Sequence, residues 1–183
     1  MRAFVGIFPP PEVQEALLRA ARSVPAPESI RWVRPANVHL TLKFLGDVRE
    51  ESLESLHAIL DGVAGRHGPF PVQTSDLGAF PSLGKARVLW AGVDKGSTEL
   101  SGLAEDVARS LETAGFDREK RAYKAHATLG RVRGRPARLP EGVGLRAPEF
   151  DVRRLELVQS RLSPEGATYS TLESYPLRFG GTR

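Results

Sequence analysis

The sequence predicts an α+β fold in which short antiparallel or mixed sheets are backed by three helices. Many short runs alternate apolar and polar residues or are rich in β-branched ones, as in half-buried strands. Three other segments repeat apolar residues every three or four positions, as in helices that bury one face. No low-complexity tract or linker divides the 183 residues, so we expect a single domain over residues 1–183.

The three helical segments have recognisable ends. The first, at about residues 11–24, follows three consecutive prolines, which suit a helix start. The second is expected after Asp47, which forms a potential capping box with Glu50. The third is expected to be capped by Ser97 and to stop near Gly115.

The strand-like runs lie before, between and after these helices. They cover residues 2–8, 30–34, 38–46, 70–78, 86–93, 123–131, about 150–160 and 167–179. A loop rich in arginine, proline and glycine follows the sixth of them and runs to about residue 146. Because the runs are short and alternate between apolar and polar residues, we expect antiparallel or mixed sheets.

Composition excludes several classes of function. The chain has no cysteine, which excludes disulfides, thiolate zinc sites and catalysis by a thiol. Its first apolar run is too short for a signal peptide, and no run is long enough to cross a bilayer, so we expect a cytoplasmic protein with no membrane partner. Of the 26 basic residues 21 are arginine, a side chain that pairs well with phosphate, although arginines that are simply solvated are the alternative.

A repeated motif is the most informative feature of the chain. Residues 39–44 read His-Leu-Thr-Leu-Lys-Phe and residues 126–131 read His-Ala-Thr-Leu-Gly-Arg. Two H-x-T-L matches among four histidines are expected by chance roughly once in 6,000 shuffled sequences. The repeat therefore indicates two related strands with a common role.

Strand geometry gives this spacing a chemical meaning. Side chains alternate between the two faces of a strand, so His39 projects with Thr41, and His126 projects with Thr128. The intervening apolar residues face the core. Two such strands side by side would line a groove with two imidazoles, which can act as acid and base at neutral pH, and two hydroxyls, which can bind phosphate oxygens.

The same motif is also compatible with a purely structural role or with a metal site. Each histidine could be a satisfied strand residue and each threonine a good strand former, but two matched copies argue against this. A metal site is disfavoured because neither motif contains a carboxylate or a second histidine at ligand spacing. We therefore expect no metal and no cofactor.

Four flanking positions are further candidates for binding the substrate. Strict alternation puts Lys43 on the face of His39 and Lys124 on the face of His126, where each could add positive charge; solvated lysines are the alternative. Phe44 and Arg131 occupy the same place in both copies. Alternation points them away from the groove unless the strand bulges there, and we include both as candidates.

Arg131 also opens the densest basic stretch of the chain, which continues with Arg133, Arg135 and Arg138. A solvated loop is one interpretation, and an arm that grips a nucleic-acid backbone is the other. The aromatic residues near the motifs could stack on bases or belong to the core. They are Phe8, Trp32, Phe80 and Tyr123.

At these motifs the chain resembles the two-histidine (2H) phosphoesterase superfamily, specifically its RNA 2′,3′-cyclic phosphodiesterases, also known as 2′-5′ RNA ligases. The likeness extends over nearly the whole chain, from Arg2-Ala3-Phe4-Val5-Gly6-Ile7-Phe8-Pro9 to Ser163-Pro164-Glu165-Gly166-Ala167-Thr168-Tyr169. One departure is Ala125, where proline is expected before the second histidine.

The resemblance implies a bilobal fold with two antiparallel sheets related by a pseudo-twofold axis, helices on the outer faces and a central groove. It implies metal-independent hydrolysis of a terminal 2′,3′-cyclic phosphate on RNA to a 2′-phosphate, with His39 as proton donor and His126 as proton acceptor. The expected partners are RNA ends of this kind, tRNA fragments among them, and the expected state is a monomer. A reversible 2′-5′ RNA ligase and an RNA-binding module without turnover are the alternatives.

Overall fold

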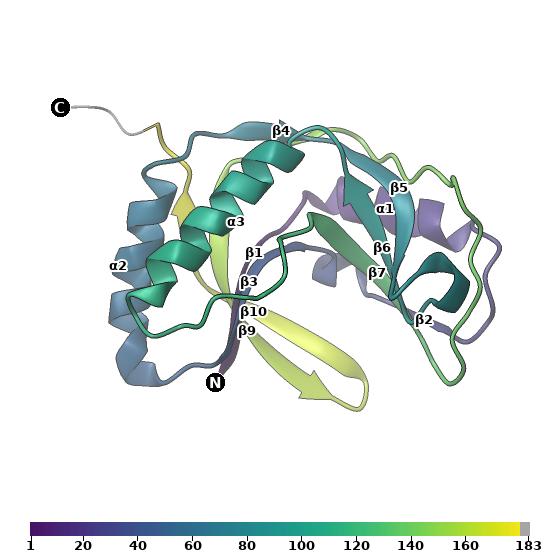
Figure 1. Ribbon diagram of the computed structural model, residues 1–183, viewed down its shortest axis with the longest axis horizontal. Coiled ribbons are helices and arrows are strands. Elements are labelled where there is room, and N and C mark those ends of the chain that lie inside the picture. Colours follow the sequence, from purple (N-terminus) through teal and green to yellow (C-terminus); the bar gives the residue numbers. More distant parts are fainter. Residues whose placement is uncertain (180–183) are drawn as a thin grey trace.

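The computed structural model describes residues 1–179 and has the α+β architecture shown in Figure 1. Its strands are β1 (Arg2–Ile7), β2 (Ile30–Trp32), β3 (Leu40–Asp47), β4 (Phe70–Val72), β5 (Thr74–Phe80), β6 (Val88–Val93), β7 (His126–Val132), β8 (Phe150–Val152), β9 (Arg154–Ser163) and β10 (Gly166–Pro176). Its α-helices are α1 (Pro11–Arg22), α2 (Leu53–Ala64) and α3 (Ser97–Glu112). The last four residues of the predicted domain, 180–183, lie outside the described residues.

Eight strands form one antiparallel sheet that consists of two halves. The first half-sheet has the order β10-β9-β1-β3, and the second has the order β7-β6-β5 with β2 alongside β7. A single residue pair, Leu40 with Ala127, joins β3 to β7. The small sheet β4-β8 lies apart from this path. The α+β class and the antiparallel sheets are thus confirmed, and the two expected sheets are the two halves that this pair connects.

The two halves are built on the same chain order and exchange their helices. Strand, helix and motif strand occur in this order as β1, α1 and β3 in one half, with β2 between α1 and β3, and as β6, α3 and β7 in the other. Helix α1 starts from the first half-sheet but contacts β7, whereas α3 starts from the second and packs against β3 and α2. Figure 1 shows α2 and α3 together on one lobe and α1 behind the other. Because each helix crosses to the opposite half, one apolar core holds both together.

Several expected details of the elements are wrong. The strand expected over 70–78 is split into β4 and β5, and the one near 150–160 into β8 and β9. Asp47 ends β3 and caps no helix; a short 3₁₀ turn, Glu50–Ser52, precedes α2 instead. Ser97 is the first residue of α3, and the capping position belongs to Gly96 in a left-handed conformation that glycine adopts without strain.

Within the described residues, no helix is both long and apolar enough to cross a membrane.

A buried carboxylate joins α2 to α3 on the outer side of the first half-sheet. Asp106 of α3 is 6% exposed and accepts two hydrogen bonds of 3.0 Å from Arg66, which follows α2. His67 Nε2 lies 2.9 Å from the same carboxylate, and Arg109 donates to it at 2.8 Å. Burial by itself raises the pKa of Asp106, but the hydrogen bonds from Arg66, His67 and Arg109 outweigh it and hold that pKa far below its usual range.

We predict that Asp106→Asn lowers the free energy of unfolding by about 1–3 kcal/mol at pH 7, measured by urea denaturation. The charge-assisted hydrogen bonds are lost, but Arg66 and Arg109 are half-exposed and regain water, which limits the effect. Glu99→Gln removes the same charge from an exposed position of α3 and is the matched control. Equal stability of the two variants would show that the cluster contributes nothing beyond surface charge.

Candidate active site

The joint between the half-sheets brings the two repeated motifs together. Leu40 pairs with Ala127 in antiparallel register, and both side chains are fully buried in the core. The residues on either side of this pair, His39 with Thr41 and His126 with Thr128, therefore project to the opposite face. Antiparallel pairing sets each histidine beside the threonine of the other strand. The motifs thus meet on one face, as the sequence predicts.

Both imidazoles are held in the same way. His39 Nδ1 lies 2.7 Å from the carbonyl oxygen of Asn37, and His126 Nδ1 lies 2.7 Å from that of Lys124. A carbonyl only accepts hydrogen bonds, so Nδ1 carries the proton in each ring. The unprotonated Nε2 of the neutral ring is then the atom available for proton transfer in both cases.

The two motif threonines are placed differently. The Thr41 hydroxyl lies 2.9 Å from His39 Nε2 and donates to it when the ring is neutral. Thr128 is half-buried on the same face, and its hydroxyl makes no hydrogen bond within residues 1–179. Both hydroxyls therefore lie where they can bind an anion between the strands.

Aromatic rings enclose His39. Phe8 stacks on the imidazole at 5.3 Å, Phe4 lies 4.7 Å from it, and Tyr169 meets it edge-on at 5.1 Å. Tyr169 comes from β10, the outermost strand of the first half-sheet. Three rings from two distant segments, β1 with the residue that follows it and β10, thus enclose one catalytic candidate.

The surroundings of His126 are more open. Phe80 meets the ring edge-on at 5.1 Å, and Trp90 lies 5.8 Å from it. The ammonium of Lys124 lies 4.5 Å above the Trp90 ring, a cation–π geometry. The predicted position of Lys124 near His126 is therefore reproduced, although its Nζ rests on the indole.

Burial changes the acid–base properties of both histidines. It lowers the pKa of His39 to about 4; the hydrogen bond to Asn37 opposes this shift, and the charge of His126 adds to it. Burial also lowers the pKa of His126, opposed by the hydrogen bond to the Lys124 carbonyl and reinforced by the Lys124 charge. Both imidazoles are therefore held mainly in the neutral form.

A β-bulge in β3 reverses the expected alternation beyond Thr41. Gly6 of β1 pairs with Thr41, but the next residue, Val5, pairs with Lys43, so Leu42 is the extra residue. Leu42 and Lys43 both face the core, and Lys43 is only 3% exposed. The expectation that Lys43 shares the face of His39 is therefore wrong.

The same bulge returns Phe44 to the groove face. Phe44 pairs with Phe4, whose ring contacts His39, and the two phenylalanine rings are 6.3 Å apart. Phe44 is 65% exposed, an unusual position for a large apolar side chain. Strict alternation would have pointed it away from the site.

Strand β7 has a bulge at the equivalent position. Trp90 pairs with Thr128 and Leu89 with Gly130, so Leu129 is the extra residue. Leu129 and Gly130 are both buried, and Arg131 returns to the face of His126. Arg131 is close enough for its charge to lower the pKa of Tyr169 against the larger effect of burial. The two motif strands are therefore alike in the position of their β-bulge as well as in their sequence.

A hairpin from the first half-sheet reaches the second across this site. Strands β9 and β10 form it, and its tip carbonyls, Pro164 and Glu165, accept hydrogen bonds from Arg31 of β2. Asn37 Nδ2 donates to the carbonyl of Ala167 at 2.8 Å. The hairpin is the long extension at the lower edge of Figure 1, and these contacts fix Tyr169 beside His39.

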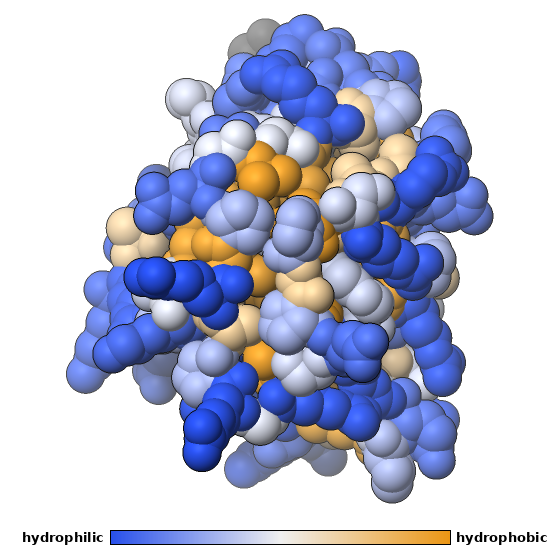
Figure 2. Space-filling view, turned by 90° about the vertical axis from the view of Figure 1, so that its right-hand side faces the viewer, coloured by the Kyte–Doolittle hydropathy of each residue, from blue (hydrophilic) through white to orange (hydrophobic). Residues whose placement is uncertain are grey.

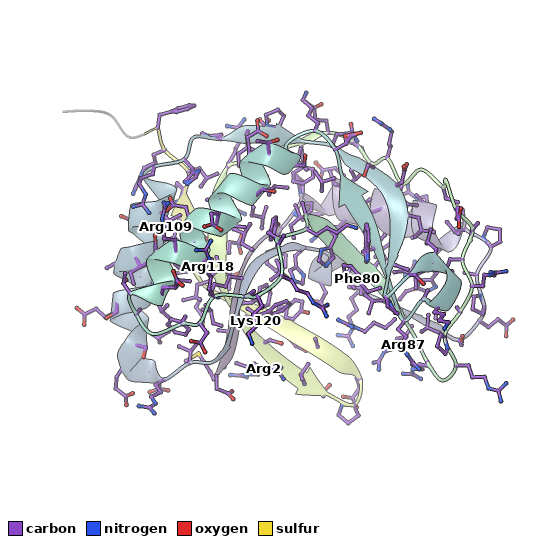
Figure 3. The ribbon with its side chains drawn as sticks, in the orientation of Figure 1. Arg2, Phe80, Arg87, Arg109, Arg118 and Lys120 are labelled. Atoms are coloured by element: carbon purple, nitrogen blue, oxygen red, sulfur yellow. The ribbon has the colours of Figure 1, made fainter. Side chains whose placement is uncertain are left out.

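The remaining predicted basic residues lie farther out. Arg133, Arg135 and Arg138 are exposed in the loop after β7. Figure 2, which looks onto the end of the molecule on the side of the second half-sheet, shows hydrophilic side chains around a central apolar area. In Figure 3, Arg87 and Phe80 lie on the side of the second half-sheet, and Lys120 lies on the side of α3.

Three residues of the site were not predicted: Phe4, Trp90 and Tyr169. A signal for the first two is present in the sequence, because Phe4-Val5-Gly6 and Trp90-Ala91-Gly92 repeat an aromatic-x-Gly pattern in the strands that flank the two motifs. Glycine leaves room for both rings, although the second glycine is not part of this pattern: a Cβ at Gly6 would lie 3.0 Å from Phe4, and one at Gly78, which pairs with Trp90, would lie 2.0 Å from the indole. No local pattern indicates Tyr169, which the hairpin brings to the site.

Comparisons with known proteins agree with this geometry. Residues 7–90 match the family model described as LigT like Phosphoesterase. The chain is 35% identical to a protein of Archaeoglobus fulgidus named RNA 2′,3′-cyclic phosphodiesterase, over 96% of this chain and 99% of that protein. It is 31% identical to a protein of the same name from Aquifex aeolicus, over 97% of both chains.

Solved structures of similar sequence have the same fold as this chain. TT0787 of Thermus thermophilus superimposes with a TM-score of 0.85 and 31% identity, over 97% of this chain and 98% of that one. LigT of E. coli in complex with 3′-AMP superimposes with a TM-score of 0.78 and 25% identity, over 97% and 98% of the two chains.

We predict that His39 makes stability depend on pH between about 4 and 6.5. In that range the unfolded chain binds a proton at His39 and the folded chain does not, so stability is lost as pH falls. The loss reaches about 3 kcal/mol for this shift. His39→Gln should reduce the fall in unfolding free energy from pH 7 to pH 4.5, measured by urea denaturation. An unchanged fall in the variant would contradict the burial of a neutral imidazole.

Proposed function

Because this chain belongs to the family of LigT-like phosphoesterases, we propose that it hydrolyses terminal 2′,3′-cyclic phosphates on RNA with His39 and His126 as its acid–base pair. The observation that carries the proposal is the matched geometry of the imidazoles. Each has Nδ1 bound to the carbonyl two residues earlier, so the unprotonated Nε2 is the nitrogen that can take up a proton; at His39 this nitrogen accepts a hydrogen bond from the Thr41 hydroxyl. Two such groups on one face suit a reaction that needs a base and an acid in one turnover.

The reaction needs one proton removed and one supplied. His126 Nε2 accepts a proton from water as the water oxygen bonds to phosphorus. The bond between phosphorus and the 3′ oxygen breaks, and His39 Nε2 donates a proton to that oxygen, which leaves a 2′-phosphate and a 3′-hydroxyl. The hydroxyls of Thr41 and Thr128 bind the non-bridging oxygens as charge develops on them.

The direction of proton transfer is part of the proposal. The resemblance assigns the donor role to His39, although burial lowers its pKa and favours its neutral form. A bound phosphate anion acts in the opposite direction, because an adjacent negative charge stabilises the imidazolium. A buried imidazolium formed in this way is a strong acid toward the departing oxygen.

Phe44, Arg131 and Lys124 are proposed to bind the rest of the substrate end. Phe44 and Arg131 stand at equivalent places beyond the two bulges and expose an aromatic face and a guanidinium on the groove face. Such groups stack on bases and pair with phosphate. Fragments of tRNA that end in a cyclic phosphate are candidate substrates. One chain carries both histidines, so a monomer suffices.

The groups on the groove face also support a reaction without a metal. Within residues 1–179, no three histidine or carboxylate side chains are grouped as metal ligands. The Nδ1 atoms of both histidines are engaged by backbone carbonyls. No observation favours a joining reaction or RNA binding without turnover over hydrolysis.

The proposal is tested with a short RNA that ends in a 2′,3′-cyclic phosphate, with and without EDTA. We expect a 2′-phosphate product at equal rates in both. His39→Ala and His126→Ala should each lower turnover by about 10²–10⁴, and the double variant should be little slower than the slower single one. Circular dichroism checks that the variants are folded. A folded single variant with near wild-type turnover, or a loss in EDTA that a divalent ion restores, would refute the mechanism.

A substrate with sulfur in place of the bridging 3′ oxygen separates the two roles. Sulfur leaves without protonation, so a missing general acid matters little, whereas a missing base still does. We expect this substrate to restore most of the turnover of His39→Ala and little of that of His126→Ala. Restoration of His126→Ala instead would reverse the assignment while keeping the two-histidine chemistry.

A further inference from the structure

Lys43 is a buried cation that the groove does not use. Its side chain lies on the face of β3 opposite His39 and is 3% exposed. Its ammonium donates one hydrogen bond of 2.6 Å, to the carbonyl oxygen of Asp117. No carboxylate of residues 1–179 lies within 4 Å of it. A buried charge without a counter-charge is costly, so two N–H groups of Lys43 call for an acceptor.

A cavity of about 350 Å³ adjoins this ammonium, and we name it the Lys43 cavity. Strand β3 and helix α3 form its inner walls, and the segment 118–123, which leads from α3 to β7, forms its outer wall. That segment contributes the basic side chains of Arg118, Lys120 and Arg121. Figure 3 shows Arg118 below α3 and Lys120 farther along the segment, near the opening between the lobes.

Charge in the Lys43 cavity is predominantly positive. Four basic side chains line it, together with two carboxylates, Glu105 and Glu119. Glu105 already forms an ion pair with Arg118. The remaining positive charge and the space between the walls suit an anion with several acceptor oxygens.

A second buried donor points to the same conclusion. Tyr123 also lines the Lys43 cavity, and its hydroxyl is buried without a hydrogen-bond partner among residues 1–179. Burial raises the pKa of Tyr123, which keeps the phenol protonated and able to donate. A buried hydroxyl without an acceptor and a buried ammonium with a single acceptor, on the walls of one cavity, are uncommon in folded proteins and call for further acceptor atoms.

We propose that the Lys43 cavity is a binding site for a phosphate group, separate from the groove that carries the histidines. Lys43 donates to the phosphate oxygens from the inner wall and Tyr123 from the outer wall, and Lys120 and Arg121 pair with them at the mouth. The phosphate is either a free ion or one in the backbone of a bound RNA. The proposal does not rest on the two-histidine chemistry, because the site lies on the other face of β3.

The test uses the ¹⁵N-labelled full chain, titrated with inorganic phosphate at constant ionic strength and followed by two-dimensional NMR. We expect the amides of residues 118–123 to shift in a saturable manner. Amides of residues 39–41 and 126–128 report separately on the groove. Lys43→Met should weaken the response of 118–123 at least tenfold and leave the groove response unchanged.

Two milder variants keep the test independent of folding. Tyr123→Phe removes only the hydroxyl and should weaken phosphate binding severalfold. Arg121→Gln should do the same, whereas Arg138→Gln, which removes the same charge from the exposed loop after β7, should not. A pentanucleotide with a 3′-hydroxyl end identifies the source: shifts of 118–123 at lower concentrations than phosphate needs indicate a backbone phosphate, and their absence indicates the free ion.

Three outcomes would overturn the proposal. The first is the absence of any saturable shift of the amides of 118–123 with either probe. The second is equally tight binding in Lys43→Met. The third is a loss in Arg138→Gln as large as that in Arg121→Gln, which would reduce the effect to general electrostatic attraction.

Discussion

The backbone pairing of Leu40 with Ala127 is the contact on which the rest of the site depends. It is the one register pair between β3 and β7 among the described residues, and it joins two four-stranded halves into one sheet. Both side chains are buried, so the face that carries His39 and His126 is fixed by core packing on the other side. A slip of one residue would send the histidines into the core and the apolar residues into the groove, which makes the register costly to change.

The exchange of helices explains how the two half-sheets stay together although a single residue pair joins β3 to β7. Helix α1 leaves the first half-sheet and packs on the second, and α3 does the reverse, so neither half has a core of its own. The hairpin β9-β10 also accepts hydrogen bonds from two residues outside it. Arg31 of β2 donates from the second half-sheet, and Asn37 donates from the turn before β3. The position of Tyr169 against His39 is thus supported by contacts with both halves.

The two halves of the site are alike in backbone and different in environment. Both motif strands bulge three residues after the histidine, and both imidazoles bind the carbonyl two residues before them. His39 lies inside three aromatic rings, whereas His126 lies beside Trp90 and the charge of Lys124. Equivalent backbone geometry with unequal burial places two chemically identical groups in different environments, which suits the separate acid and base roles proposed for them.

The sequence by itself determined the fold class, the three helices and the strand faces that His39 shares with Thr41 and His126 shares with Thr128. These follow from short-range periodicity, which local residues specify: a histidine and a threonine two apart must share a strand face. Helix caps were less predictable, because Asp47 can end a strand as readily as begin a helix. The aromatic-x-Gly repeat was also local, although its meaning depends on which strands are neighbours.

Only the tertiary structure decided what surrounds the motifs. The bulges at Leu42 and Leu129 arise from pairing with β1 and β6, and they moved Lys43 into the core while returning Phe44 and Arg131 to the groove. Tyr169 reaches His39 from a strand far along the chain through the hairpin contacts. A one-residue insertion into a ladder and the packing of distant segments are set by long-range contacts, and no window of local sequence contains them.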